Sequence, residues 1–166
     1  MTTTVTDPSQ APLEFSDQQV LPEWIDFNGH MNVAYYVMAF DHGVDGLTSY
    51  LDIGPEGIEA RGTSTFTLEM HTNYLQELHL DDPIRLTCQL LDYDSKRVHF
   101  FFTMYHTEEN YLAATCEQLL LHVNLEERRS SPFPQSAVSK LETLMLLHRQ
   151  LPRPEKAGRS IGIRRR

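Results

Sequence analysis

The segment Asp26-Phe27-Asn28-Gly29-His30-Met31-Asn32 leads directly into an amphipathic run from Val33 to Leu51. It places a carboxylate, a glycine turn and the N-terminus of a predicted helix within a few residues. A carboxylate can act as nucleophile or general base, and the free N–H groups of a first helical turn can polarise a carbonyl oxygen. This combination suits acyl transfer. Ordinary turn and N-cap residues have the same composition, so the segment alone also fits a purely structural interpretation.

The run after this segment predicts one long helix, and most of the remaining chain predicts a sheet. Its apolar residues recur at intervals of four and three, which places them on one helical face: Val33, Val37, Phe40, Val44, Leu47 and Leu51. After a glycine-rich loop over 54–62 the period changes to two, with Phe66, Leu68, Met70 and Tyr74 expected on one face of a strand. Further strands are expected over 84–90, 98–104 and 111–123, with a short strand over 15–21 and a final helix over 136–150. The pattern predicts an α+β fold in which the long helix packs on an antiparallel meander.

Size and charge narrow the function. A chain of 166 residues suits one domain, and a net charge of −9 gives no general basic field for nucleic acid. No apolar run approaches the ~20 residues that span a bilayer, and no leader pattern opens the chain, so we expect a cytoplasmic protein without membrane association. Cys88 and Cys116 are predicted to be buried free thiols. We expect disorder over 1–13, one domain over 14–155 and a basic tail over 156–166.

A strand, a long helix and four antiparallel strands follow the order of the hotdog fold, in which a curved sheet wraps around one central helix. The motif Asp26-x-x-Gly29-His30-Met31-Asn32-x-x-Tyr35-Tyr36 resembles that of hotdog thioesterases of the 4-hydroxybenzoyl-CoA thioesterase type, and the likeness covers roughly residues 15–125. A closer resemblance is to the betainyl-CoA thioesterases associated with carnitine dehydrogenase. It is carried by residues 22–36, 117–123 and 128–134, and it extends to about Arg166.

This resemblance implies an acyl-CoA thioesterase that hydrolyses betainyl-CoA to glycine betaine and CoA without a cofactor. It also implies a homodimer or dimer of dimers and a functional association with carnitine dehydrogenase. Two alternatives stay open: a thioesterase for another short or aromatic acyl-CoA, and a non-catalytic hotdog module that binds acyl-CoA.

The resemblance also assigns catalytic roles. Asp26 matches the aspartate that attacks the thioester or activates water, and the sequence does not choose between these routes. The other catalytic candidates are His30, Asn32 and Glu117, for which packing, helix capping and an outward sheet position are the respective alternatives. The expected oxyanion donors are the backbone N–H groups of Gly29, Met31 and Val33.

Five further residues are expected to bind substrate: Trp24, Asn28, Tyr35, Glu69 and His71. The faces of Trp24 and Tyr35 would attract the quaternary ammonium of a betainyl group, whereas periodicity places Tyr36 on the buried helix stripe. Glu69, His71 and Glu117 are polar residues in alternating strands, and in a hotdog dimer they would face Asp26 of the partner protomer. The histidines lack the ligand spacing of zinc sites, so no metal is expected.

Overall fold

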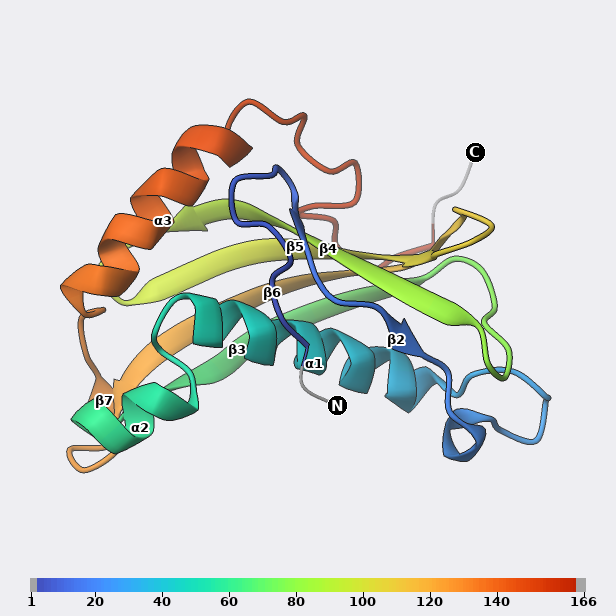
Figure 1. The fold of residues 1–166 in the computed structure, drawn as a ribbon, viewed down its shortest axis with the longest axis horizontal. Coiled ribbons are helices and arrows are strands. Elements are labelled where there is room, and N and C mark those ends of the chain that lie inside the picture. Colours follow the sequence, from blue (N-terminus) through green and yellow to red (C-terminus); the bar gives the residue numbers. More distant parts are fainter. Residues whose placement is uncertain (1–2, 164–166) are drawn as a thin grey trace.

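The structure is a computed structural model and describes residues 3–163 (Figure 1). Its strands are β1 (Leu13–Glu14), β2 (Gln18–Gln19), β3 (Thr63–Tyr74), β4 (Pro83–Tyr93), β5 (Arg97–His106), β6 (Leu112–Asn124) and β7 (Arg129–Ser130). The helices are α1 (Val33–Tyr50), α2 (Pro55–Arg61) and α3 (Gln135–His148), with a 3-10 turn at Pro22–Trp24. The strands form one antiparallel sheet in the order β1-β4-β5-β6-β3, with β2 beside β4 and β7 beside β6. With α1 lying across one face, this arrangement confirms the predicted hotdog fold.

The predicted long helix is confirmed as α1. Asn32 caps it, because its side-chain oxygen accepts the N–H of Ala34 at 2.9 Å. The buried face is nevertheless shifted from the predicted stripe and includes Tyr36, Ala39, Phe40, Gly43, Val44, Gly46, Leu47 and Thr48. A Cβ on Gly43 would lie 3.0 Å from side-chain atoms of Leu86 and Phe102, so this face approaches the sheet through its small residues. A count of large apolar residues does not detect such a contact.

Strand β3 contains an irregularity that the sequence pattern did not predict. Its pairing with β6 skips Leu68, which makes a β-bulge. Phe66 lies opposite Leu121 and Met70 lies opposite Gln118, two β6 residues three positions apart. Because opposed residues share a face and faces alternate along β6, Phe66 and Met70 project from opposite faces. The expectation that they share one face is wrong.

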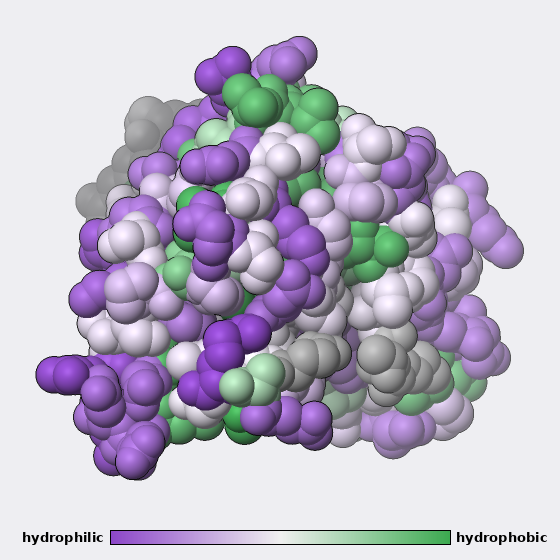
Figure 2. All heavy atoms as spheres, turned by 60° about the vertical axis from the view of Figure 1, so that its left-hand side comes forward, coloured by the Kyte–Doolittle hydropathy of each residue, from purple (hydrophilic) through white to green (hydrophobic). Residues whose placement is uncertain are grey.

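The second edge of β3 is open. Within residues 3–163, β3 pairs only with β6, so the backbone groups along its other edge have no strand partner. Exposed apolar side chains gather in β3 and beside it: Val33, Phe66, Leu68, Met70, Tyr74 and Leu75. Figure 2 turns the α2, β7 and α3 side of the molecule forward, and that face is mostly hydrophilic with small separate apolar groups. An open edge with apolar side chains favours pairing with another chain.

The N-terminal segment differs from the disorder expected over 1–13. Leu13 is fully buried opposite Cys88, and Val5 forms a bridge with Phe15. The N–H of Thr6 donates to the carbonyl oxygen of Glu14 at 2.9 Å. The edge of β4 provides backbone partners that a composition rule does not consider, so residues 3–13 are ordered against the domain. Residues 1–2 lie outside the described residues.

Two other segments also differ from expectation. The predicted loop over 54–62 contains α2, which starts at Pro55 and ends at Arg61. Gly62 follows as its C-cap in a left-handed conformation with φ of 62°. The tail predicted over 156–166 contacts the sheet at Gly158, whose N–H donates to Glu117 Oε2 at 2.7 Å, whereas Ile161 and Ile163 are exposed. Residues 164–166 lie outside the described residues. Cys88 and Cys116 are buried free thiols, as predicted.

Candidate active site

Asp26 lines a pocket of about 320 Å³ at the N-terminal end of α1. The pocket is bounded by Asp26, His30, Met31, Val33, Tyr36 and Tyr74, and by residues 75–77 of the loop that follows β3. Four of the residues singled out from the sequence therefore meet here, together with two tyrosines and a loop from a distant part of the chain.

The turn before α1 fixes the Asp26 carboxylate. The N–H of Asp26 donates to the His30 carbonyl at 3.1 Å, and the N–H of Gly29 donates to the Asp26 carbonyl at 3.0 Å. Gly29 has φ of 86°, a conformation that favours glycine. The N–H of Asn28 donates to Asp26 Oδ1 at 2.8 Å, so the backbone of this predicted substrate-binding residue holds the carboxylate.

The expected set of oxyanion donors is largely engaged in this turn. Gly29 donates as described, and the N–H of Met31 donates to the Leu78 carbonyl at 2.7 Å. The prediction is therefore wrong for Gly29 and Met31, because these N–H groups close the turn and dock it on the β3–β4 loop. The N–H of Val33 has no acceptor among residues 3–163, and Val33 lines the pocket. Of the three expected oxyanion donors, Val33 is thus the one whose N–H is left free for a carbonyl oxygen.

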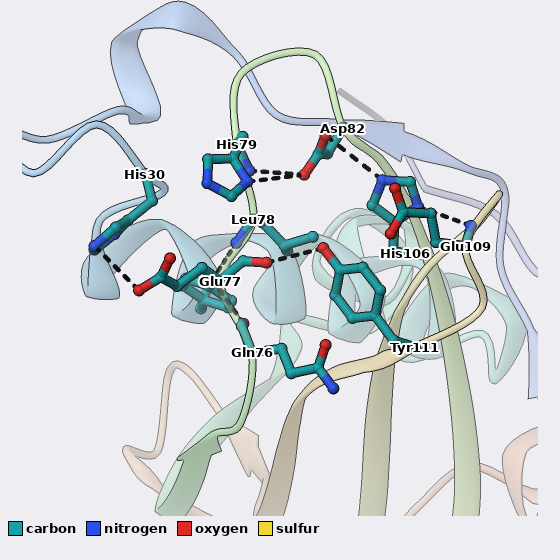
Figure 3. A network of polar contacts seen from close by, with 10 residues as sticks. His30, Gln76, Glu77, Leu78, His79, Asp82, His106, Glu109 and Tyr111 are labelled. Carbon is teal, nitrogen blue, oxygen red and sulfur yellow. Dashed lines mark hydrogen bonds and ion pairs between the residues drawn. The ribbon is translucent and has the colours of Figure 1, made fainter.

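The loop beyond β3 forms one wall of the pocket (Figure 3). His30 Nε2 lies 3.7 Å from Glu77 Oε1, and the hydroxyl of Tyr111 donates to the Glu77 carbonyl at 2.9 Å. The Tyr36 hydroxyl accepts the Leu78 N–H at 3.1 Å and donates to the Gln76 carbonyl at 3.3 Å. Burial raises the pKa of Tyr36 to about 12, which keeps this hydroxyl protonated. These contacts hold the wall in place.

The same loop is anchored again where it enters β4. His79 donates its N–H to Asp82 Oδ2 at 2.7 Å, and His106 Nε2 lies 3.5 Å from Asp82 Oδ1. His106 Nδ1 in turn accepts the N–H of Glu109 at 3.1 Å. The network in Figure 3 therefore runs from the pocket wall to the start of β4. Sequence reasoning missed Glu77 because a polar loop residue has no periodic or motif signal.

The two residues expected to form an aromatic cage do not line the Asp26 pocket. Trp24 is only 2% exposed and stacks on Tyr35 with ring centroids 5.7 Å apart, and neither residue lines the Asp26 pocket. Trp24 and Tyr35 instead pack against each other beneath the start of α1. The aromatic residues of the pocket are Tyr36 and Tyr74, whose rings meet edge to face with centroids 5.4 Å apart.

Glu117, Glu69 and His71 lie elsewhere. They border a second pocket of about 430 Å³, which the tail closes with Gly158, Arg159 and Ser160. Glu117 Oε1 lies 2.8 Å from His99 Nε2. Glu117 alternates with the core residues Cys116 and Leu120 along β6 and so faces away from α1. The structure therefore does not bring these three residues to Asp26 of their own chain.

Two negative findings hold for residues 3–163. No three side chains of His, Cys, Asp and Glu lie close enough together to hold a metal ion. In the same part of the chain, no helix is long and apolar enough to cross a membrane.

A long helix on a curved antiparallel sheet, with a carboxylate and a free N–H group at the helix start, defines a hotdog protein of the thioesterase type. The chain belongs to the Thioesterase-like superfamily, whose sequence model matches residues 20–141. The fold and family predicted from the sequence are thus confirmed.

The similar proteins include named thioesterases. The chain is 40% identical over 144 residues to the betainyl-CoA thioesterase of Pseudomonas aeruginosa, covering 87% of this chain and 91% of the relative. It is 34% identical over 157 residues to an L-carnitine dehydrogenase/betainyl-CoA thioesterase of Rhizobium meliloti, covering 95% of this chain but only 32% of that longer protein. A Staphylococcus aureus protein solved in complex with CoA is 32% identical, with a TM-score of 0.85 over 99% of this chain and 98% of the other. These similarities support thioester hydrolase activity.

Proposed function

We propose that this protein hydrolyses betainyl-CoA to glycine betaine and CoA. The observation that carries the proposal is the 40% identity to a betainyl-CoA thioesterase over nearly the whole length of both chains. The pocket at Asp26 supports it, because a fixed carboxylate and the free Val33 N–H lie at one helix N-terminus.

The proposed reaction begins with attack on the thioester carbonyl carbon. Either an Asp26 oxygen forms the new C–O bond, giving an anhydride that water then hydrolyses, or Asp26 takes a proton from an attacking water. The Val33 N–H stabilises the developing oxyanion. The C–S bond breaks and CoA leaves as a thiolate, which then takes up a proton. His30 donates a hydrogen bond to the substrate, while Asn32 keeps α1 capped.

The open edge of β3 supports the proposal of a homodimer. Pairing of two β3 strands would satisfy the unpaired backbone groups and cover the exposed apolar residues beside them, including Leu68 and Tyr74. A dimer of dimers would keep the same contact. Light scattering at micromolar concentration is expected to give a mass of at least two chains, and a stable, active monomer would contradict this assembly.

We further propose a functional association with carnitine dehydrogenase. It is supported by relatives whose names combine L-carnitine dehydrogenase and betainyl-CoA thioesterase in one protein. Acyl-CoA esters are intracellular metabolites, so the reaction is proposed to take place in the cytoplasm.

A thiol-release assay over a panel of acyl-CoA esters tests the activity. The panel holds betainyl-CoA, other short acyl-CoAs and aromatic acyl-CoAs at equal concentration. The highest kcat/KM is expected for betainyl-CoA. A clear preference for another ester would replace the substrate assignment, and binding of CoA esters without release of thiol would indicate a non-catalytic module.

A further inference from the structure

The Asp26 pocket carries negative charge. Two carboxylates, those of Asp26 and Glu77, line it, and its nine lining residues include His30 but neither lysine nor arginine. Such a pocket repels the CoA phosphates and an anionic acyl group, and it attracts a cation. Catalysis by Asp26 accounts for only one of these two carboxylates.

The rings of Tyr36 and Tyr74 line the same pocket as these two carboxylates. Tyr74 is 45% exposed, and its hydroxyl donates to the Val33 carbonyl at 3.5 Å, which turns the polar end of the side chain toward the start of α1. Burial raises the pKa of both Tyr36 and Tyr74, so each ring stays a neutral phenol. The face of a neutral tyrosine ring attracts a quaternary ammonium ion, which cannot accept or donate ordinary hydrogen bonds.

The main chain around Glu77 is held in place, which keeps its carboxylate at the pocket. Its backbone carbonyl accepts the Tyr111 hydroxyl at 2.9 Å, and the neighbouring residues Gln76 and Leu78 are both bound to Tyr36. The Glu77 side chain is 66% exposed and lies 3.7 Å from His30 Nε2, a distance and exposure at which an ion pair contributes little. The main chain is therefore fixed while the carboxylate can turn to a ligand.

We propose that Glu77 is a specificity-determining residue that, with the rings of Tyr36 and Tyr74, binds the cationic end of the acyl group. This inference rests on the proposed hydrolysis of betainyl-CoA and adds the residues that select its charge. Glu77 takes no part in bond making or breaking, which remains with Asp26.

The test compares two substrates on the Glu77→Gln variant. Betainyl-CoA and 3,3-dimethylbutyryl-CoA have acyl groups of the same shape, and only the first is charged. Wild type is expected to prefer betainyl-CoA. Glu77→Gln should lower kcat/KM for betainyl-CoA by roughly 2- to 10-fold, mainly through KM, and leave the neutral ester within about 2-fold. Glu142→Gln, which removes the same charge from an exposed position on α3, is the matched control and should change neither value.

A charge-reversal variant and added salt test whether Glu77 acts through its charge. Glu77→Lys should lower kcat/KM for betainyl-CoA further and favour the neutral ester, and added salt should reduce the wild-type preference because it screens exposed charges. Equal losses on both substrates, or an unchanged preference in Glu77→Gln, would overturn the role of Glu77 while leaving the hydrolase intact. A wild type that cleaves neither ester would instead refute the proposed function.

Discussion

Removing the Tyr36 hydroxyl tests how the pocket wall is held. Tyr36→Phe keeps the ring but leaves the Leu78 N–H and the Gln76 carbonyl without the partner that each has in the structure. Because Tyr36 is 4% exposed, water cannot easily replace the hydroxyl. Leaving buried polar groups unpaired costs about 1–3 kcal/mol of unfolding free energy. For a chain of this size that cost corresponds to a Tm lower by roughly 3–10 °C.

The adjacent Tyr35 provides the control. Its ring stacks on Trp24, and its hydroxyl has no hydrogen-bond partner among the described residues. Tyr35→Phe should therefore stay within about 0.5 kcal/mol of wild type. Urea unfolding followed by circular dichroism gives both values, and kcat/KM for betainyl-CoA should fall for Tyr36→Phe because the wall carries Glu77. Equal stability of the two variants would refute the anchoring role of the hydroxyl.

Three shorter predictions concern other parts of the fold. Gly46→Ala would place a Cβ 2.5 Å from the Thr3 carbonyl oxygen, so it should lower the unfolding free energy by roughly 1–3 kcal/mol, and an unchanged urea midpoint would mean that the N-terminal segment does not pack there. Burial lowers the pKa of His148 from 6.5 to about 4. Because the unfolded chain then takes up the proton at a higher pH than the folded protein does, wild type should lose stability as pH falls from about 6.5 to 4. His148→Asn, whose oxygen can still accept the Leu90 N–H, should flatten that pH dependence, and an identical slope in urea midpoints would contradict the assignment. Leu68→Lys puts a charge on the open edge of β3 and should shift light scattering toward the monomer, whereas an unchanged mass would place the chain contact elsewhere.

Interactions between residues close in sequence made α1 and strands β4 to β6 predictable. The period of α1, its cap at Asn32 and the alternation in β4 to β6 depend on neighbouring residues, so the sequence alone indicates them. The turn before α1 is also local, which is why Asp26, His30 and Val33 were correctly placed at the start of the helix and meet in one pocket.

The errors have long-range causes. Tyr36 and Leu78 are 42 residues apart in sequence, so the wall that carries Glu77 follows only from the folded chain. The bulge at Leu68 changes the faces of β3, and Trp24 is removed from the pocket by stacking on Tyr35. For Trp24 and Tyr35, nearness in sequence to Asp26 therefore did not mean a place in its pocket.

The most direct test of the account is betainyl-CoA hydrolysis by wild type and Asp26→Asn. The asparagine oxygen can still accept the Asn28 N–H, so the turn should keep its shape while the carboxylate is lost. Wild type is expected to release CoA thiol rapidly, and kcat of Asp26→Asn should be lower by about 10³-fold or more with little change in affinity. Hydrolysis by Asp26→Asn at a rate near that of wild type would contradict the central role of Asp26.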